Sequence, residues 1–363
     1  MGTVPKDAYH VVAISCGRDH TLALLDTGKA MGWGGNGSGR LPVEVPELCS
    51  AFAAPTHPVE VAMRPRLRSV AAGHGVSLGL TESNEVAIWG ACAAGVGGRL
   101  ESVAAAMPQV VASLSAAREV AAGEFHFAAI DEAGIVHTWG LNIDGALGRP
   151  SAELNTEPGP IPELPPVSRA VVGQGFMLAL TRDGRLFAWG SNTAGQLGLG
   201  HLHTAKTPMR VALPARIKGV AAGATHALAI SPTGKVYAWG SNHRGQLGIG
   251  VPAYSATPVL LDLPERIKTV AAGLHFSLAL SDTGNVYAWG WNALGQLGLN
   301  DQADRRRAAR IQTLSGVRSI AAGQTHAVAS APGHLYGWGS NASGQIGTAD
   351  SRQSRPFSFL TTS

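Results

Sequence analysis

The stretch Val220-Ala-Ala-Gly-Ala-Thr-His-Ala-Leu-Ala-Ile-Ser-Pro-Thr-Gly-Lys-Val-Tyr-Ala-Trp-Gly240 decides the fold. Two short apolar segments, Val220–Gly223 and His226–Ile230, precede a tight Ser-Pro-Thr-Gly turn. Lys235–Gly240 then alternates polar and apolar residues, as a half-buried strand does. After a long loop, Thr257–Leu261 is a fourth strand, whose proline suits an outer edge. The unit therefore predicts four short antiparallel strands.

The Trp-Gly pair that ends this stretch recurs seven times, at Trp33, Trp89, Trp139, Trp189, Trp239, Trp289 and Trp338. The successive steps are 56, 50, 50, 50, 50 and 49 residues, and such a fixed period indicates a repeat architecture. Four strands every ~50 residues make one propeller blade, and blades must stack to bury both of their faces. The sequence therefore predicts an all-β, seven-bladed β-propeller that spans residues 1–363 as one domain.

The residue types also predict how each unit is placed in the ring. The small residues of Val-Ala-Ala-Gly fit the crowded strand next to the axis, and the tryptophan strand fills the wedge between blades. The last strand would be Arg355–Leu360, and the first is Val11–Ser15. We expect these N- and C-terminal strands to share one blade, which would close the ring and remove its open edges.

Composition and charge narrow the classes of partner. Charged residues make up 14 % of the chain, well below the typical ~25 %, and the net charge is +4. Without a Lys/Arg-rich tail, nucleic acid is not an expected partner. Met1–Lys6 leads into the first strand without the apolar core of a signal peptide, and no apolar run approaches membrane-spanning length. We therefore expect a cytoplasmic protein that contacts no membrane.

Residues 170–348 repeat the unit almost position by position, including its loop, as in Ser191-Asn192…Gly195-Gln196-Leu197-Gly198. Together with the Ala-Ala-Gly and Trp-Gly strands, this unit resembles the repeat of the regulator-of-chromosome-condensation family. The resemblance covers the whole chain and implies a seven-bladed β-propeller. Members of that family include guanine-nucleotide exchange factors, a plant ultraviolet photoreceptor and a bacterial β-lactamase inhibitor, so the resemblance does not settle function.

Two departures argue against particular members of the family. The exchange factor carries a protruding β-wedge and a basic N-terminal tail, whereas repeats 2 to 7 here are nearly constant in length and the N-terminus is short. The photoreceptor carries Gly-Trp-Arg-His-Thr segments, but the matching segments Gly17-Arg-Asp-His-Thr21 and Gly323-Gln-Thr-His-Ala327 hold no tryptophan. A light sensor is therefore not expected.

The candidate site follows from strand direction. Because antiparallel strands alternate in direction, the turn after each Ala-Ala-Gly and the long loop after each Trp-Gly lie on one face, which we call the loop face. Binding residues concentrate on such loops over a rigid scaffold, and aromatic residues beside charged ones have the composition of an interaction hot spot. The candidate partner- or ligand-binding residues are Arg18, Asp19, His74, Glu124, Phe125, Leu141, Leu274, His275 and Trp291.

The predicted function is a non-enzymatic interaction scaffold that binds a protein partner through the loop face. One alternative is guanine-nucleotide exchange on a small GTPase. Another is an enzyme with a small-molecule site at the axial mouth, where Asp19, His20, His74, Glu124 and His275 would meet. No catalytic residue is assigned, since no nucleophile, base and acid stand together in the sequence.

The proposed anchors also have a purely structural interpretation, in which Trp291 caps its own blade and Phe125 packs under a neighbour. The loops Gly35–Pro65 and Ala91–Gly97 lack the Asn-x-x-Gly-Gln-Leu-Gly pattern of the later repeats. Because insertions on a repeat scaffold tend to map to the binding face, this divergence favours a specific site in the first three blades.

The remaining motifs are interpreted as scaffold. Four histidines occupy equivalent repeat positions, and we expect their ring nitrogens to fix one blade to the next; they are His20, His126, His226 and His326. Gly32–Gly37 matches a dinucleotide-binding pattern, but no helix follows it, so no cofactor is expected. His201-Leu-His203 lacks a third ligand nearby, and the three cysteines are far apart in the chain (Cys16, Cys49 and Cys92), so no metal site is expected.

Overall fold

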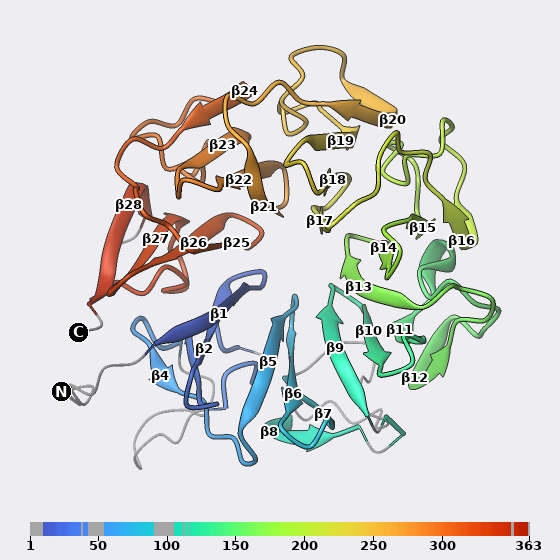
Figure 1. Cartoon of the computed structure of the whole chain (residues 1–363). Helices are drawn as coiled ribbons and strands as arrows, with labels where there is room; N and C mark the ends of the chain where they lie inside the picture. Colours follow the sequence, from blue (N-terminus) through green and yellow to red (C-terminus); the bar gives the residue numbers. More distant parts are fainter. Residues whose placement is uncertain are drawn as a thin grey trace.

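The computed structural model describes residues 10–37, 39–42, 54–90, 105–111, 113–114, 116–349 and 352–361. These residues form seven four-stranded antiparallel sheets around a common axis, as the sequence predicts (Figure 1). Each sheet is built from four consecutive strands, and we number the sheets blades 1 to 7 in chain order. Over these ranges, no helix has the length and apolar character that crossing a membrane requires.

The strands of the first three blades are as follows. Blade 1 holds β1 (Val11–Cys16), β2 (His20–Leu25), β3 (Ala30–Gly34) and β4 (Val59–Glu60). Blade 2 holds β5 (Leu67–Ala72), β6 (Val76–Thr81), β7 (Val86–Gly90) and β8 (Ala105–Val110). Blade 3 holds β9 (Ala117–Ala122), β10 (His126–Asp131), β11 (Val136–Leu141) and β12 (Leu154–Pro160), with one short 3-10 helix, η1 (Ile143–Gly145), after β11.

The strands of the last four blades follow the same order. Blade 4 holds β13 (Val167–Val172), β14 (Phe176–Thr181), β15 (Leu186–Gly190) and β16 (Ala205–Arg210). Blade 5 holds β17 (Gly219–Ala222), β18 (His226–Ile230), β19 (Val236–Ser241) and β20 (Tyr254–Leu260). Blade 6 holds β21 (Ile267–Ala272), β22 (Phe276–Ser281), β23 (Val286–Gly290) and β24 (Arg305–Arg310). Blade 7 holds β25 (Ser319–Ala322), β26 (His326–Ala331), β27 (His334–Ser340) and β28 (Arg352–Thr361).

The first strand of each blade lies nearest the axis, as predicted (Figure 1). Space is smallest there, and the glycine that follows the strand is required by the close approach of neighbouring blades. A Cβ atom on Gly223 would lie 2.5 Å from the carbonyl oxygen of Gly273 in the next blade, and one on Gly17 would lie 2.3 Å from that of Gly73. The small residues of the repeat therefore set the width of the axial opening.

The seven Trp-Gly tryptophans are all fully buried and fill the space between blades, as predicted. Trp239 of blade 5 packs against Leu178 and Leu197 of blade 4. Its indole N–H donates a 2.9 Å hydrogen bond to the carbonyl of Gln196, which lies in the loop of blade 4. Trp289 repeats this bond one blade further on, at 2.8 Å to the carbonyl of Gln246. Six of the seven tryptophans thus combine apolar burial with a hydrogen bond to the preceding blade of the ring: Trp33, Trp89, Trp189, Trp239, Trp289 and Trp338.

Three of the repeat histidines connect blades as predicted. The Nε2 atoms of His20 and His226 lie 2.9 Å from the hydroxyl oxygens of Ser77 and Ser277 in the next blade. His326 Nε2 of blade 7 lies 2.9 Å from Thr21 Oγ1 of blade 1. His126 differs, because the next blade has Met177 where the blades that receive the other three histidines carry a hydroxyl. Its buried Nε2 has no hydrogen-bond partner among the described residues.

The prediction that the N- and C-terminal strands share one blade is wrong. β1 pairs with β2 inside blade 1, whereas β28 pairs with β27 inside blade 7. Blade 7 meets blade 1 by the contacts that join the other blades. Trp33 Nε1 donates to the carbonyl of Gln345 at 3.0 Å, beside the Thr21–His326 contact. The ring closes without strand exchange because the loop after Trp338 reaches the next blade as its counterparts do.

Candidate functional site

The loop face is assembled by hydrogen bonds between its two kinds of loop. The amide of Trp291 donates to the carbonyl of His275 at 2.9 Å, and that of Leu141 donates to the carbonyl of Phe125 at 2.8 Å. The glycine between tryptophan and this contact is essential: Gly290 has φ of 105°, and a Cβ there would lie 2.5 Å from the carbonyl oxygen of His275. The residues after each Trp-Gly therefore stand directly outside the inner turns, as the sequence predicts.

A belt of backbone hydrogen bonds surrounds the axial mouth. The residue after an entry glycine donates its amide to a carbonyl in the corresponding turn of the next blade. Six such bonds, of 3.0 to 3.3 Å, join the amides of Arg18, His74, Gln174, Ala224, Leu274 and Gln324 to the carbonyls of Gly73, Gly123, Ala224, Leu274, Gln324 and Gly17, in that order. The positions of the side chains around the mouth are therefore fixed by the scaffold.

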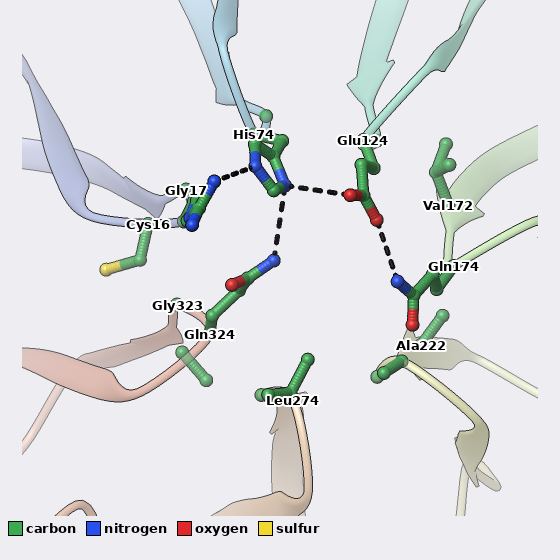
Figure 2. Close-up of a pocket in the computed structure, with 18 of the residues that line it drawn as sticks. Cys16, Gly17, His74, Glu124, Val172, Gln174, Ala222, Leu274, Gly323 and Gln324 are labelled. Carbon is green, nitrogen blue, oxygen red and sulfur yellow. Dashed lines mark hydrogen bonds and ion pairs between the residues drawn. The ribbon is translucent and has the colours of Figure 1, made fainter. Parts of the chain in front are cut away.

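The mouth encloses a cavity of about 130 Å³. Four of the predicted site residues line it: Arg18, His74, Glu124 and Leu274. The lining side chains that were not among the predicted residues include Cys16, Gln174 and Gln324, besides Val172 and several alanines. Figure 2 shows His74, Glu124 and Gln174 linked along one side of the cavity, with Gln324 approaching His74 and Leu274 facing them unlinked. The mouth is thus polar over blades 7 and 1 to 4, and apolar over blades 5 and 6.

Hydrogen bonds and one histidine–carboxylate contact connect the side chains of the polar side. The Arg18 guanidinium contacts His74 Nε2, and His74 Nδ1 lies 3.3 Å from Glu124 Oε1. Gln174 Nε2 donates to Glu124 Oε2 at 2.9 Å. Because arginine only donates, His74 accepts at Nε2, and its Nδ1 can donate to the Glu124 carboxylate, which describes the neutral imidazole. The Gln324 amide nitrogen lies 3.4 Å from the same Nδ1. Burial lowers the pKa of His74; Glu124 acts against this shift, while Arg18 and Arg40 reinforce it.

The other five predicted residues lie outside the cavity on the same face. Phe125 stacks on His74 with ring centroids 6.2 Å apart, and Leu141 follows it through the backbone contact described above. Trp291 meets His275 edge to face, with centroids also 6.2 Å apart. Phe125 and Trp291 are both half-buried, so neither is enclosed between blades. The aromatic residues therefore flank the mouth in two places, over blades 2 to 3 and over blade 6.

Asp19 is held by a residue that the sequence analysis did not single out. Arg40 pairs with the Asp19 carboxylate and donates to the carbonyl of His74 at 3.0 Å. Its side chain is only 9 % exposed, and burial lowers its pKa. Arg40 stands where the later repeats carry glutamine, and Asn36 Oδ1 accepts from the amide of Leu41 at 2.8 Å as the later asparagines do.

The expectation that the first-repeat loop lacks the common pattern is thus wrong for the described part of residues 36–41, which keep its geometry with arginine in place of glutamine. Residues 43–53 of the expected insertion Gly35–Pro65 lie outside the described residues, as does Ala91–Gly97 of repeat 2.

The side chains at the mouth offer hydrogen bonds and aromatic contacts more than reactive groups. Of the five residues that an enzyme would bring together, only His74 and Glu124 meet: Asp19 pairs with Arg40, His20 is buried against Ser77, and His275 lies beside Trp291. Burial raises the pKa of the Cys16 thiol to about 12, which keeps it protonated. Among the described residues, no group of three or more His, Cys, Asp or Glu is placed to hold a metal ion.

Known proteins share this architecture. The family model for the regulator of chromosome condensation (RCC1) repeat matches residues 133–180, 183–230, 233–280 and 283–330, and a second model of that repeat matches residues 11–40 as well as later units. Prp20p from Saccharomyces cerevisiae, a structure described with its binding to Gsp1p and histones, is 26 % identical with a TM-score of 0.79, covering 88 % of this chain and 82 % of that one.

Two further structures are similar to this chain. Yeast RCC1 (Prp20) in a structure with Kap60 is 26 % identical with a TM-score of 0.78, over 86 % of this chain and 78 % of that one. Human WBSCR16 is 21 % identical with a TM-score of 0.81, over 91 % and 93 % of the two chains, which shows a shared fold. No curated protein sequence matches the chain.

Proposed function

The chain belongs to the regulator of chromosome condensation repeat family, and we propose that it is a non-enzymatic module that binds a protein partner through the loop face. The observation that carries this proposal is the pair of half-buried aromatic residues that flank a small, hydrogen-bonded mouth. Similar propellers are described with protein partners: Prp20p with Gsp1p and histones, and yeast RCC1 with Kap60.

The size of the mouth favours a macromolecule over a small ligand. Sites for small molecules usually enclose ~300–1,000 Å³, whereas this cavity holds about 130 Å³. Its polar groups are also engaged with one another, since His74 contacts Arg18, Glu124 and Gln324, and Glu124 contacts His74 and Gln174. A partner would therefore gain little by inserting a group deep into the mouth and more by covering its rim.

The rim supplies what a protein interface uses. Phe125 and Trp291 present aromatic side chains that are partly exposed. Arg18, which lines the mouth, is exposed. Aromatic and arginine side chains are the residue types that carry most binding energy in protein interfaces. Because backbone hydrogen bonds hold Arg18, Phe125 and Trp291 to neighbouring turns and loops, a partner would not have to order the backbone that bears them. These features support a compact contact of two aromatic anchors around a charged centre.

Alanine substitutions at the two anchors test the proposal. A partner captured from the source of the protein should bind Trp291→Ala or Phe125→Ala about 2 kcal/mol more weakly, which is roughly thirty-fold in Kd, while thermal unfolding stays unchanged. Tyr254→Ala is the matched control, because Tyr254 is a 46 % exposed aromatic residue on the outer strand β20. Equal weakening by all three variants, or by none, would contradict the proposed face.

Guanine-nucleotide exchange is the second candidate, favoured by the 26 % identity with Prp20p. Exchange requires an element that disturbs the nucleotide site of a GTPase, and the segment that would supply it is 44–60, of which the structure describes 54–60. We expect nucleotide-release assays with a panel of small GTPases to show no acceleration. Acceleration that disappears when residues 44–60 are deleted would instead establish exchange and replace the interaction-module proposal.

A further inference from the structure

The face opposite the loop face carries a ring of positive charge at the axis. The innermost strands run from that face toward the entry glycines, so their first residues lie at its centre. We count the residues of each inner segment from its start on that face. The second residue is a cation in five of the seven blades, and in blade 4 the cation is the third residue. These six residues, which we call the cationic ring, are Arg68, Arg118, Arg169, Lys218, Lys268 and Arg318, and all six are exposed.

Hydrogen bonds between blades hold the cationic ring together. Arg68 Nη2 donates to the carbonyl of Ala117 at 2.7 Å, next to Arg118 in the chain. Arg118 Nη2 donates to the carbonyl of Ser168 at 3.3 Å, next to Arg169, and Lys268 Nζ lies 3.4 Å from the carbonyl of Arg318 itself. These three side chains, of Arg68, Arg118 and Lys268, are thus directed at the backbone that bears the next cation. Such a bond uses one donor of the five on a guanidinium, so donors remain for a ligand.

Neighbouring acids do not neutralise the positive charge of the cationic ring. At its positions and those directly next to them, the one acid is Glu119, which pairs with Arg169 at 3.8 Å. Six cations less one carboxylate leave +5 at the axis, against +4 for the whole chain. Crowded charges of one sign raise the free energy of the folded state and attract ligands of opposite sign. The propeller fold does not require a cation at this position of the inner segment, because Val12 and Ser168 occupy it in blades 1 and 4.

The acids that surround the cationic ring indicate how wide an anionic ligand could be. Further from the axis, the turns between second and third strands carry exposed acids in five blades. One is Asp183, at the second turn position of blade 4, and the other four stand at the first turn position: Asp26, Glu82, Glu132 and Asp282. Their amides bond to residues just before the inner strands, as Asp282 N does to the carbonyl of Arg266 at 3.0 Å. Charge there is mixed, since Arg266 also pairs with Asp282 at 3.2 Å. A wide polyanion such as duplex nucleic acid would meet these acids, whereas a narrow one would contact the ring alone.

A single strand of nucleic acid is also a poor match. Proteins that bind single strands combine positive charge with aromatic side chains on which bases stack. The six ring residues and the residues that follow them in their strands include no aromatic side chain. We propose that the cationic ring is a docking site for an acidic segment of a protein partner, a run of Asp and Glu residues. Since it lies on the opposite face, this proposal does not rest on the loop-face function.

Fluorescence anisotropy with a labelled decaglutamate peptide tests the docking site on the full chain. We expect binding that weakens as salt rises from about 50 to about 200 mM, because screening shortens the reach of exposed charges. Lys218→Glu combined with Lys268→Glu should weaken it at least about tenfold. The matched control is Arg306→Glu with Arg307→Glu, which makes the same change in net charge at two exposed positions of the outer strand β24. The control should stay within about twofold of the unaltered chain.

Several results would overturn the proposal. Absence of peptide binding at low salt would do so. An equal loss of binding in the Lys218/Lys268 variant and in the Arg306/Arg307 control would also do so, because it would reflect net charge alone. Tighter binding of a single-stranded oligonucleotide or a duplex of equal charge would assign the ring to nucleic acid instead. Lys218→Ala with Lys268→Ala provides a milder test if charge reversal lowers the melting temperature, and an unchanged affinity in that folded variant would also refute it.

Discussion

Replacing Thr21 by valine tests whether blade 7 joins blade 1 as the other blades join. The Thr21 hydroxyl lies 2.9 Å from both His326 Nε2 and the carbonyl oxygen of Gln345, and its single proton is donated to that carbonyl. His326 must then donate from Nε2 to the hydroxyl oxygen. In Thr21→Val the carbonyl keeps the Trp33 indole as a donor at 3.0 Å, but the buried N–H of His326 loses its acceptor.

The expected cost is about 2 kcal/mol, because an unsatisfied buried donor costs ~1–3 kcal/mol and the added methyl group offsets part of it. Unfolding entropy is ~2.1 cal/mol/K per residue, so the 363 residues give roughly 0.76 kcal/mol/K and a fall in melting temperature of about 2 to 3 °C. Calorimetry at pH 7.5 measures this shift.

Ser277→Ala is the matched control at the contact between blades 5 and 6. Ser277 contacts His226 Nε2 at 2.9 Å and donates to the carbonyl of Gln246 at 2.8 Å, which also accepts from Trp289. The same reasoning gives the same loss, so the two variants should melt within about 1 °C of each other. If Thr21→Val melts like the unaltered protein while Ser277→Ala does not, the contact between blades 7 and 1 is open in solution and the closure described here is refuted.

Three further outcomes are expected. Burial lowers the pKa of His20, holds that of His126 at about 4 and those of His226 and His326 at about 3, whereas the unfolded chain binds these protons near pH 6.5. The free energy of unfolding should therefore be highest above about pH 6.5. Below that pH it should fall by up to ~1.4 kcal/mol per pH unit for each histidine, or ~5 kcal/mol per pH unit for four. Urea unfolding at pH 7.5, 6 and 5 measures this fall, and equal stability at pH 7.5 and 5 would contradict burial of neutral histidines. Arg40→Gln restores the glutamine of the later loops and should cost less than ~1 kcal/mol by the same urea assay, since Asp19 retains access to water; a loss above ~3 kcal/mol would make the Arg40–Asp19 pair essential to the fold. Deletion of residues 352–363 removes β28 and uncovers the edge of β27, so the melting temperature should fall by more than about 5 °C or the protein should aggregate, and an unchanged melting curve would show that blade 7 does not need its outer strand.

Sequence alone predicted the propeller because its determinants are local and periodic. Each Trp-Gly pair marks a strand whose tryptophan must be buried between blades, and a step of 50 residues leaves room for one blade and no more. The incorrect part of the prediction concerns the two terminal strands, which were expected to share one blade. The pattern of Val11–Ser15 is that of any inner strand, and nothing in it shows whether its blade is completed by β4 or by β28. That choice depends on contacts such as Trp33 with Gln345, which are 312 residues apart.

The candidate site was predicted in outline, because strand direction alone places Arg18, His74, Glu124 and Leu274 around one opening. Gln174 and Gln324 occupy equivalent turn positions and could have been included for that reason, but a glutamine on a turn is usually a solvated residue. Arg40 could have been found by aligning Asn36 and Leu41 with the later loops, which puts it at the glutamine position. What the sequence does not contain is the order of contacts, such as Arg18 to His74 to Glu124, because that depends on side-chain directions.

The belt of backbone hydrogen bonds around the mouth has a consequence for the kinetics and heat of association. Six turns are each tied to a neighbour, so the amides of Arg18, His74, Gln174, Ala224, Leu274 and Gln324 should exchange with deuterium far more slowly than turns usually do. A partner therefore meets a surface already in its bound shape, and any ordering cost falls on the partner. Association should proceed in one phase, with no slow rearrangement of this chain. Its change in heat capacity should match the apolar area covered, with no added contribution from folding of this chain.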